Sequence, residues 1–129
     1  MLGRRDMCAR RFEDLTVWQL GDEIRQKVFE LTETGKVCTD FRFRNNLRDA
    51  ASSINRNIAE GFGRYKHKEF AQGLNVSSGS VSEVRDQLID GCKRRYWTEA
   101  KIADLEALCR REKSALANFI AYLRSTPDV

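Results

Sequence analysis

The sequence predicts an all-α protein, an antiparallel up-down-up-down four-helix bundle. Apolar residues recur at spacings of three and four along four segments, and no segment shows the strict alternation of a half-buried strand. The only proline among the 129 residues, Pro127, lies close to the C-terminus, so no proline ring interrupts these segments. Charged residues make up 33% of the chain and apolar residues 41%, which is typical of a folded, helix-rich protein. Four amphipathic helices with short connections favour a bundle.

The length fits one domain with terminal extensions. We expect a basic, flexible N-terminal tail over residues 1–11, the bundle over 12–124 and a C-terminal tail over 125–129. The N-terminus is charged and lacks the apolar segment of a signal peptide, and the longest apolar runs are too short to span a bilayer. We therefore expect a cytoplasmic protein with no membrane partner.

The first helix is expected over residues 16–33. Thr16 and Gln19 fit a capping box, in which the two side chains satisfy free backbone N–H groups at the helix start. Apolar residues then recur on one face, and Gly35 is a plausible stop.

The second helix is expected over residues 43–62. Its apolar face contains several small residues, which let a neighbouring helix approach closely. Gly61 or Gly63 ends it, because glycine interrupts a helix readily.

The third and fourth helices are expected over residues 66–94 and 98–123. Serine and glycine between Ser77 and Ser82 lower helix propensity, so the third segment is either broken near Gly79 or is one kinked helix. The continuing apolar spacing favours one helix whose serine and glycine face lies against another helix. Thr98 is the expected cap of the fourth helix.

The residues give no support for catalysis, a metal site or a cofactor. Four cysteines are scattered without a C-x-x-C pair, and His67 is the only histidine. We find no nucleophile–base motif and no paired carboxylates on an expected inner face. The cysteines are interpreted as reduced thiols, two of them in the core.

Basic charge is concentrated on the second helix and the turn after it. Seven arginines and lysines but only two acidic residues lie between Arg42 and Lys68, so this segment has a net charge of +5, whereas the whole chain has +4. Such a patch is typical of a protein that binds nucleic-acid phosphates, and the alternative is a solvated helix face. The candidate binding residues are Arg44, Arg48, Arg56, Arg64, Lys66 and Lys68. The tail adds Arg4, Arg5, Arg10 and Arg11.

The glycine-rich stretch after the second helix is interpreted as a turn. Gly61-Phe62-Gly63 fails the dinucleotide-binding pattern, because Lys66 stands where the last glycine belongs and a helix precedes it. Phe62 and Tyr65 can stack on bases, and the alternative is that they pack within the protein.

The charges around this turn oppose the helix dipoles. Glu60 lies in the last turn of the second helix, where an anion is disfavoured, so we expect Arg64 or Arg48 as its partner. Lys66 and Lys68 open the third helix, where cations are disfavoured. Either they point into water, or they flank a site for an external phosphate at the free N–H groups.

Five segments resemble a known family. The chain resembles the four-helix-bundle proteins encoded in intervening sequences of bacterial large-subunit ribosomal RNA genes, which are related to the accessory variability determinant of diversity-generating retroelements. The resemblance covers residues 12–123, and the N-I-A-E-G-x-G-R string from Asn57 to Arg64 is its most specific part. The segments are "FEDLTVWQL" (12–20), "SINRNIAEGFGRY" (53–65), "KEF" (68–70), "SSGSVSE" (77–83) and "YW" (96–97).

This resemblance implies an antiparallel four-helix bundle that assembles as a ring-like homopentamer with a basic surface, and no enzymatic activity. For the retroelement branch it implies binding to a reverse transcriptase and its RNA or DNA. The family usually has proline and serine at Asn55 and Arg56, a serine cap at Lys66 and glycine at Arg95. Three of these four departures add a cation, which favours a member that handles nucleic acid.

We therefore predict a non-enzymatic, basic, homo-oligomeric protein that binds nucleic acid, RNA rather than DNA, as the partner of a reverse transcriptase in a diversity-generating retroelement. The alternative is a bundle protein of the ribosomal-RNA intervening-sequence branch, acting as a structural or protein-interaction oligomer.

Overall fold

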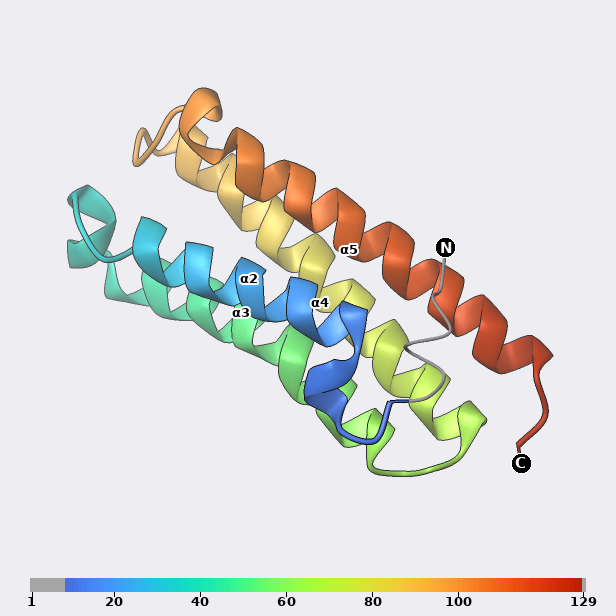
Figure 1. Cartoon of the computed structure of the whole chain (residues 1–129). Helices are drawn as coiled ribbons and strands as arrows, with labels where there is room; N and C mark the ends of the chain where they lie inside the picture. Colours follow the sequence, from blue (N-terminus) through green and yellow to red (C-terminus); the bar gives the residue numbers. More distant parts are fainter. Residues whose placement is uncertain (1–8, 129) are drawn as a thin grey trace.

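The computed structural model describes residues 9–128, which fold into four α-helices with no strand among them. Consecutive helices run in opposite directions (Figure 1). Each helix packs on the next, and α5 packs back on α2. The elements in chain order are the 3-10 turn η1 (Phe12–Asp14), α2 (Thr16–Leu31), the 3-10 turn η2 (Lys36–Thr39), α3 (Phe41–Phe62), α4 (His67–Lys93) and α5 (Glu99–Ser125). The expected all-α, four-helix architecture is confirmed for this part of the chain.

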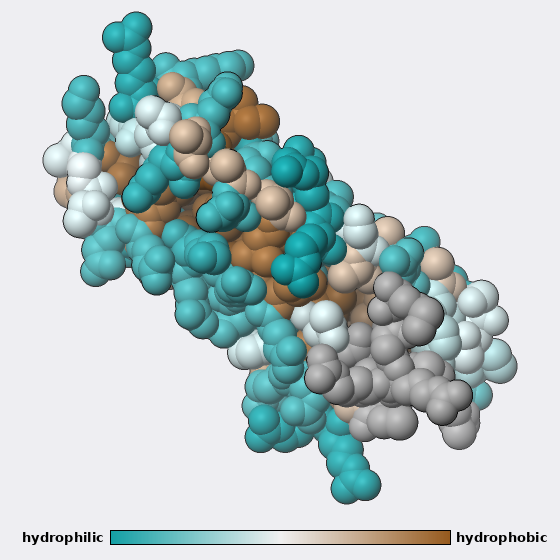
Figure 2. Space-filling view, turned by 45° about the horizontal axis from the view of Figure 1, so that its top comes forward, coloured by the Kyte–Doolittle hydropathy of each residue, from teal (hydrophilic) through white to brown (hydrophobic). Residues whose placement is uncertain are grey.

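The core lies along the axis between the four helices, where apolar side chains from every helix are buried. Figure 2 shows apolar side chains in a band along the seam between α2 and α5, with hydrophilic side chains on both borders. The shortest helix, α2, covers only part of α5, which has 27 residues against 16.

The expected start of the fourth helix agrees with the structure, and that of the second helix does not. The fourth-helix cap is confirmed, because the Thr98 hydroxyl accepts a hydrogen bond from the Lys101 N–H at 3.2 Å. The second helix begins at Phe41, two residues earlier than expected, because Asp40 caps it by accepting from the Phe43 N–H at 3.2 Å.

The expected capping box at the first helix is wrong in its register. Leu15, not Thr16, occupies the N-cap position and makes no side-chain cap bond. The Gln19 amide donates instead to the Glu13 carbonyl at 3.1 Å, which ties α2 to η1. The helix ends at Leu31, and Gly35 follows in the left-handed region with φ of 84°.

The serine-rich middle of the third helix does not break it, since α4 is continuous. On the side facing α3, the Ser77 hydroxyl donates to the Ile54 carbonyl at 2.8 Å, and the hydroxyls of Ser53 and Ser80 lie 2.9 Å apart. Small side chains therefore join α3 and α4 through hydrogen bonds where larger apolar ones would hold the helices apart.

On the side facing α5, a lysine uses the same serine-rich segment. The Lys113 ammonium donates to the Ser78 hydroxyl at 2.9 Å and to the Ser82 hydroxyl at 2.8 Å. Gly79 lies on the exposed face with no atom near the position of a Cβ, so the expectation that it lies against another helix is wrong.

The two glycines of the turn have different roles. Gly63 occupies the C-cap of α3 with φ of −69°, which ends the helix as expected. Gly61, expected as a breaker, lies inside α3 and is buried against α4. A Cβ on Gly73 of α4 would lie 3.0 Å from the Gly61 Cα and 2.8 Å from the Asn57 carbonyl oxygen. The two glycines therefore let the helices meet backbone to backbone.

The α3–α4 and α4–α5 turns each contain a non-glycine residue with a left-handed backbone conformation. Tyr65 and Arg95 both have φ of 63°. Arg95 is the position at which the resembling family usually has glycine, and a left-handed conformation costs a residue with a Cβ about 1–2 kcal/mol.

We expect Arg95→Gly to raise the free energy of unfolding by about 0.5–1 kcal/mol, because glycine adopts this conformation freely but loses more backbone entropy on folding. Urea unfolding followed by circular dichroism measures the change. The control is Arg95→Ala, which removes the charge and keeps the Cβ. Equal stability of the glycine and alanine variants would contradict the prediction.

Candidate nucleic-acid interface

The six candidate basic residues do not form one cluster. The first half of α3 is separated from the α3–α4 turn by about 25 Å along the helix axis, at 1.5 Å per residue. By position they are Arg44 and Arg48 in the first half, Arg56 in the second half, and Arg64, Lys66 and Lys68 in and beside the turn.

Arg48 is held in a structural contact at the end of α2. Its Nε donates to the Thr32 hydroxyl at 2.8 Å and its Nη2 to the Phe29 carbonyl at 3.4 Å. The guanidinium lies 4.5 Å from the centre of the Phe29 ring. A cation at the carboxyl end of a helix is favoured by the helix dipole, so Arg48 fixes α2 on α3.

Arg44 is also engaged within the protein, whereas Arg56 is open to solvent. Arg44 lies 5.2 Å from the centre of the Phe41 ring and donates to the Cys38 carbonyl at 3.4 Å. Arg56 is exposed and approaches Asp49 only to 3.9 Å. Of these two, Arg56 is the one available to an external anion.

Glu60 has the arginine partner that its position predicts. Its carboxylate accepts from the Arg64 guanidinium at 3.2 Å. The prediction is therefore confirmed with Arg64, and Arg48 lies elsewhere. Both side chains are exposed, so the pair orients Arg64 more than it stabilises the fold.

An internal carboxylate occupies the start of α4. The His67 backbone N–H, the first of the helix, donates to the Asp128 carboxylate at 2.7 Å, and the His67 Nδ1 lies 2.7 Å from the Thr126 carbonyl. Asp128 thus supplies an anion where the flanking cations predict one. The external phosphate stays a prediction, and a phosphate at this N–H would compete with Asp128.

The cations beside this helix start remain open. Lys66 and Lys68 are exposed, and neither ammonium has an ion pair within residues 9–128. We call Arg64, Lys66 and Lys68 the basic corner. Arg10 and Arg11 of the tail are exposed, and Arg11 lies 3.8 Å from Glu13, whereas Arg4 and Arg5 fall outside the described residues.

The two aromatic residues of the turn differ. Phe62 is half-buried and packs edge-on against Phe70, with ring centres 5.8 Å apart. Tyr65 is 88% exposed. Packing is therefore correct for Phe62, and Tyr65 is the ring that remains accessible for stacking.

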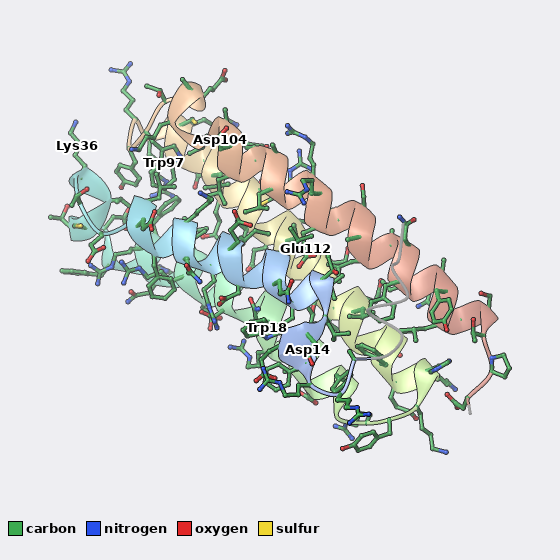
Figure 3. All side chains as sticks on the ribbon, in the orientation of Figure 1. Asp14, Trp18, Lys36, Trp97, Asp104 and Glu112 are labelled. Atoms are coloured by element: carbon green, nitrogen blue, oxygen red, sulfur yellow. The ribbon has the colours of Figure 1, made fainter. Side chains whose placement is uncertain are left out.

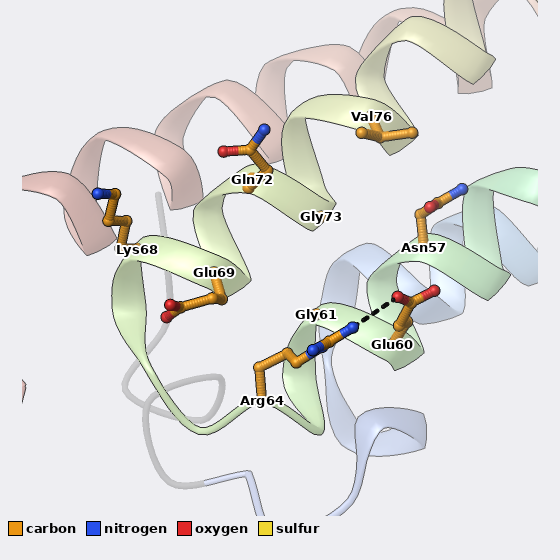
Figure 4. A pocket seen from close by; sticks show the side chains of 9 residues that line it. All are labelled: Asn57, Glu60, Gly61, Arg64, Lys68, Glu69, Gln72, Gly73 and Val76. Carbon is orange, nitrogen blue, oxygen red and sulfur yellow. Dashed lines mark hydrogen bonds and ion pairs between the residues drawn. The ribbon is translucent and has the colours of Figure 1, made fainter.

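A groove of about 340 Å³ lies between the end of α3 and the start of α4 (Figure 4). Gly61 and Gly73 lie at its base, where the two backbones meet. Side chains of mixed polarity line it: Asn57, Glu60, Arg64, Lys68, Glu69, Gln72 and Val76. The basic corner is thus continuous with a recess that also contains carboxylates and amides.

The N-I-A-E-G-x-G-R string supplies the α3 side of this groove. A protein-family model also matches the chain. The model described as the 23S rRNA-intervening sequence protein matches residues 13–118. The chain belongs to this family. Comparison with curated proteins finds none that matches it.

For this intervening-sequence protein, the match extends from η1 into α5 and includes the basic corner and the groove. No helix in residues 9–128 is long and apolar enough to cross a membrane.

The core of this family member contains polar groups that the apolar periodicity does not predict. Glu112 of α5, an interruption in the apolar stripe, is fully buried on the inner side of the helix (Figure 3), and both carboxylate oxygens lack a hydrogen-bond partner among the described residues. Burial raises the pKa of Glu112 to about 9.

Two neighbours on other helices share this site. Asn55 of α3 donates to the Trp18 carbonyl at 2.9 Å, and its own Oδ1 is buried without a partner among residues 9–128. A Cβ on Gly21 of α2 would lie 3.0 Å from the Asn55 Oδ1 and 3.1 Å from the Glu112 Oε2. Gly21 therefore leaves space beside both the amide oxygen and the carboxyl group.

The thiols of the described residues are free, and one is fully buried. Burial raises the pKa of Cys109 to about 12 and raises that of the half-buried Cys92. Both are protonated at neutral pH and poor nucleophiles. Cys109 is in the core and Cys92 packs against it, in line with the two expected core cysteines. Cys38 is half-buried, and Cys8 falls outside the described residues.

The groove also contains residues that were not among the candidates from the sequence. Glu69 and Gln72 lie on one face of α4 because they are three residues apart. Glycine spacing on both helices was the available signal, since Gly61 and Gly73 bring the two segments together. No local signal places Asp128 beside His67, because the contact joins residues 61 positions apart.

Proposed function

We propose that this member of the 23S rRNA-intervening sequence protein family is a non-enzymatic, cytoplasmic accessory protein that binds nucleic acid, RNA rather than DNA, through the basic corner. The single observation that supports this most is the pair of exposed ammonium groups on Lys66 and Lys68, neither of which forms an ion pair among the described residues, although Asp128 lies at His67 between them. Cations that fold without acidic partners are available to backbone phosphates.

The placement of the other candidates refines the proposed surface. Arg48 and Arg44 contribute to packing, so the surface extends from the basic corner to Arg56 on the open face of α3. Tyr65 stands beside the corner with its ring in solvent, where a base can stack on it.

We further propose that the protein works as a ring-like homopentamer and, in a diversity-generating retroelement, as the partner of a reverse transcriptase. Exposed apolar side chains outside the groove offer contacts between copies: Phe41 is 63% exposed and Ile89 47%. A ring would repeat the basic corner around its axis. Light scattering would give five times the chain mass, and copurification with any reverse transcriptase encoded nearby tests the partner.

The double variant Lys66→Glu/Lys68→Glu should bind RNA at least about tenfold more weakly at low salt, because each phosphate that the protein no longer neutralises keeps its counterions. The slope of log affinity against log salt should fall by about one for each such phosphate. Fluorescence anisotropy with a labelled RNA across a salt series measures both.

The matched control is Lys27→Glu/Lys101→Glu, which makes the same charge change at the α2–α5 groove. It should keep most of the affinity. An equal loss in both double variants would place binding elsewhere. Absence of salt-dependent binding by the unmodified protein would favour the alternative, a structural or protein-interaction oligomer.

A further inference from the structure

The groove beside the basic corner does not have the composition of a phosphate site. The Glu69 side chain has no hydrogen-bond or ion-pair partner within residues 9–128, and Glu69 lines the groove together with Glu60. Figure 4 shows Glu69 on α4 and the Glu60–Arg64 pair on the α3 side, with the Glu69 carboxylate turned away from the pair in this view. Arg64 and Lys68 also line the groove, so a phosphate that entered it would meet carboxylates as well as cations. The unpaired Glu69 carboxylate favours a group that donates hydrogen bonds.

The other residues of the groove offer a hydrogen-bond acceptor, an apolar contact and space. The Asn57 amide nitrogen is already used, since it donates to the Ser53 carbonyl at 2.8 Å and to the Ser53 hydroxyl at 3.0 Å. Its carbonyl oxygen is left as an acceptor. Val76, 48% exposed, adds an apolar contact at one end of the groove. Gly61 and Gly73 form the floor of the groove, which is deeper because these residues have no side chains.

We propose that this groove binds one unpaired nucleobase, guanine in preference to uracil, of a strand whose phosphates lie on the basic corner. The two oxygens of the Glu69 carboxylate match the adjacent N1–H and N2–H donors of guanine, whereas uracil offers one N–H between two carbonyl oxygens. Lys68 and Arg64, which line the groove with Glu69, hold the neighbouring phosphates. This inference rests on the proposed function.

The strand must be single at this point. In a duplex the Watson–Crick edge of guanine is already paired, whereas unpaired bases can be turned out and bound on that edge. The groove therefore gives selectivity for loops, bulges and single strands, and the cations alone give none.

The direction in which Glu69→Gln changes the affinity tests the proposal. Glu69→Gln removes a negative charge, so simple electrostatics predicts tighter binding to any strand. We expect instead about tenfold weaker binding to a strand of about 12 uridines with one central guanosine, within the range for loss of a bidentate base contact. Affinity for the all-uridine strand should not fall. The matched control is Glu83→Gln, an exposed charge on the same helix outside the groove.

Titration calorimetry or anisotropy at one low salt concentration separates the outcomes. Equal binding of the guanosine and uridine strands by the unmodified protein would overturn the proposal, as would a Glu69→Gln variant that behaves like Glu83→Gln. In both cases the proposed function would still stand if the Lys66→Glu/Lys68→Glu variant bound the strands more weakly than the unmodified protein. Absence of binding to either strand would overturn both. Binding of the same sequence made entirely of deoxynucleotides, compared with the RNA strand, distinguishes DNA from RNA as the source of the base.

Discussion

Gly91→Ala should destabilise the bundle by about 3 kcal/mol, although alanine is the better helix former. A Cβ on Gly91 would lie 2.1 Å from the Trp97 Cζ2 and 2.3 Å from its Cε2. The indole is 7% exposed, donates from Nε1 to the Leu88 carbonyl at 2.8 Å and packs on Phe43. The methyl group must displace the ring, so the variant loses both the packing of the indole and its hydrogen bond. Urea unfolding measures the loss.

The same helix supplies the control. Gly79 is exposed with no atom within 4 Å of a Cβ position, so Gly79→Ala should stabilise by about 0.5–1 kcal/mol through helix propensity alone. The two substitutions are chemically identical and should have opposite signs. Stabilisation by both would show that Trp97 does not rest on Gly91.

Glu112→Gln should stabilise the protein at neutral pH by up to about 3 kcal/mol. The buried carboxyl group has a folded pKa of about 9, above the ordinary value of 4.5. The folded state therefore binds the proton more tightly than the unfolded state. The free energy of unfolding from this group is highest below pH 4.5 and falls by about 1.4 kcal/mol per pH unit as the pH rises towards 9. Glutamine keeps the shape and cannot ionise.

The measurement is the difference in unfolding free energy between Glu112→Gln and the unmodified protein at several pH values from 4 to 9. The difference should grow with pH. Asp40 has a lowered pKa, chiefly from the Tyr96 hydrogen bond, so its effect appears only as the pH falls into the acid range, and it cancels in the difference. Glu23→Gln, an exposed carboxylate on α2, should show no such trend. A pH-independent difference would mean that Glu112 is solvated.

Periodicity predicted where the helices lie because burial of one face is a local property of the sequence. The helix limits were close: α4 was expected over 66–94 and covers His67–Lys93. Errors came from choices between similar local partners. Asp40 extended α3, and Leu15 took the N-cap expected at Thr16.

The candidate site was less predictable, because charge alone does not tell which cations are used inside the protein. Arg64 lies four residues from Glu60 and pairs with it, as that spacing favours, but no local pattern shows that Arg48 binds the end of α2. The groove needs two helices in register, and the Asp128 contact needs the whole bundle. Such features follow from packing between distant segments, which no local pattern encodes.

The left-handed Arg95 has a practical consequence for dissecting this protein. Natural proteins lie just above the stability they need, so a charge reversal that costs a little folding energy can be mistaken for a loss of binding. Arg95 lies in the α4–α5 connection, away from the basic corner, and its strain is removable by one substitution. An Arg95→Gly background would widen the margin against unfolding, so that substitutions at the α3–α4 turn report on recognition and not on the amount of folded protein.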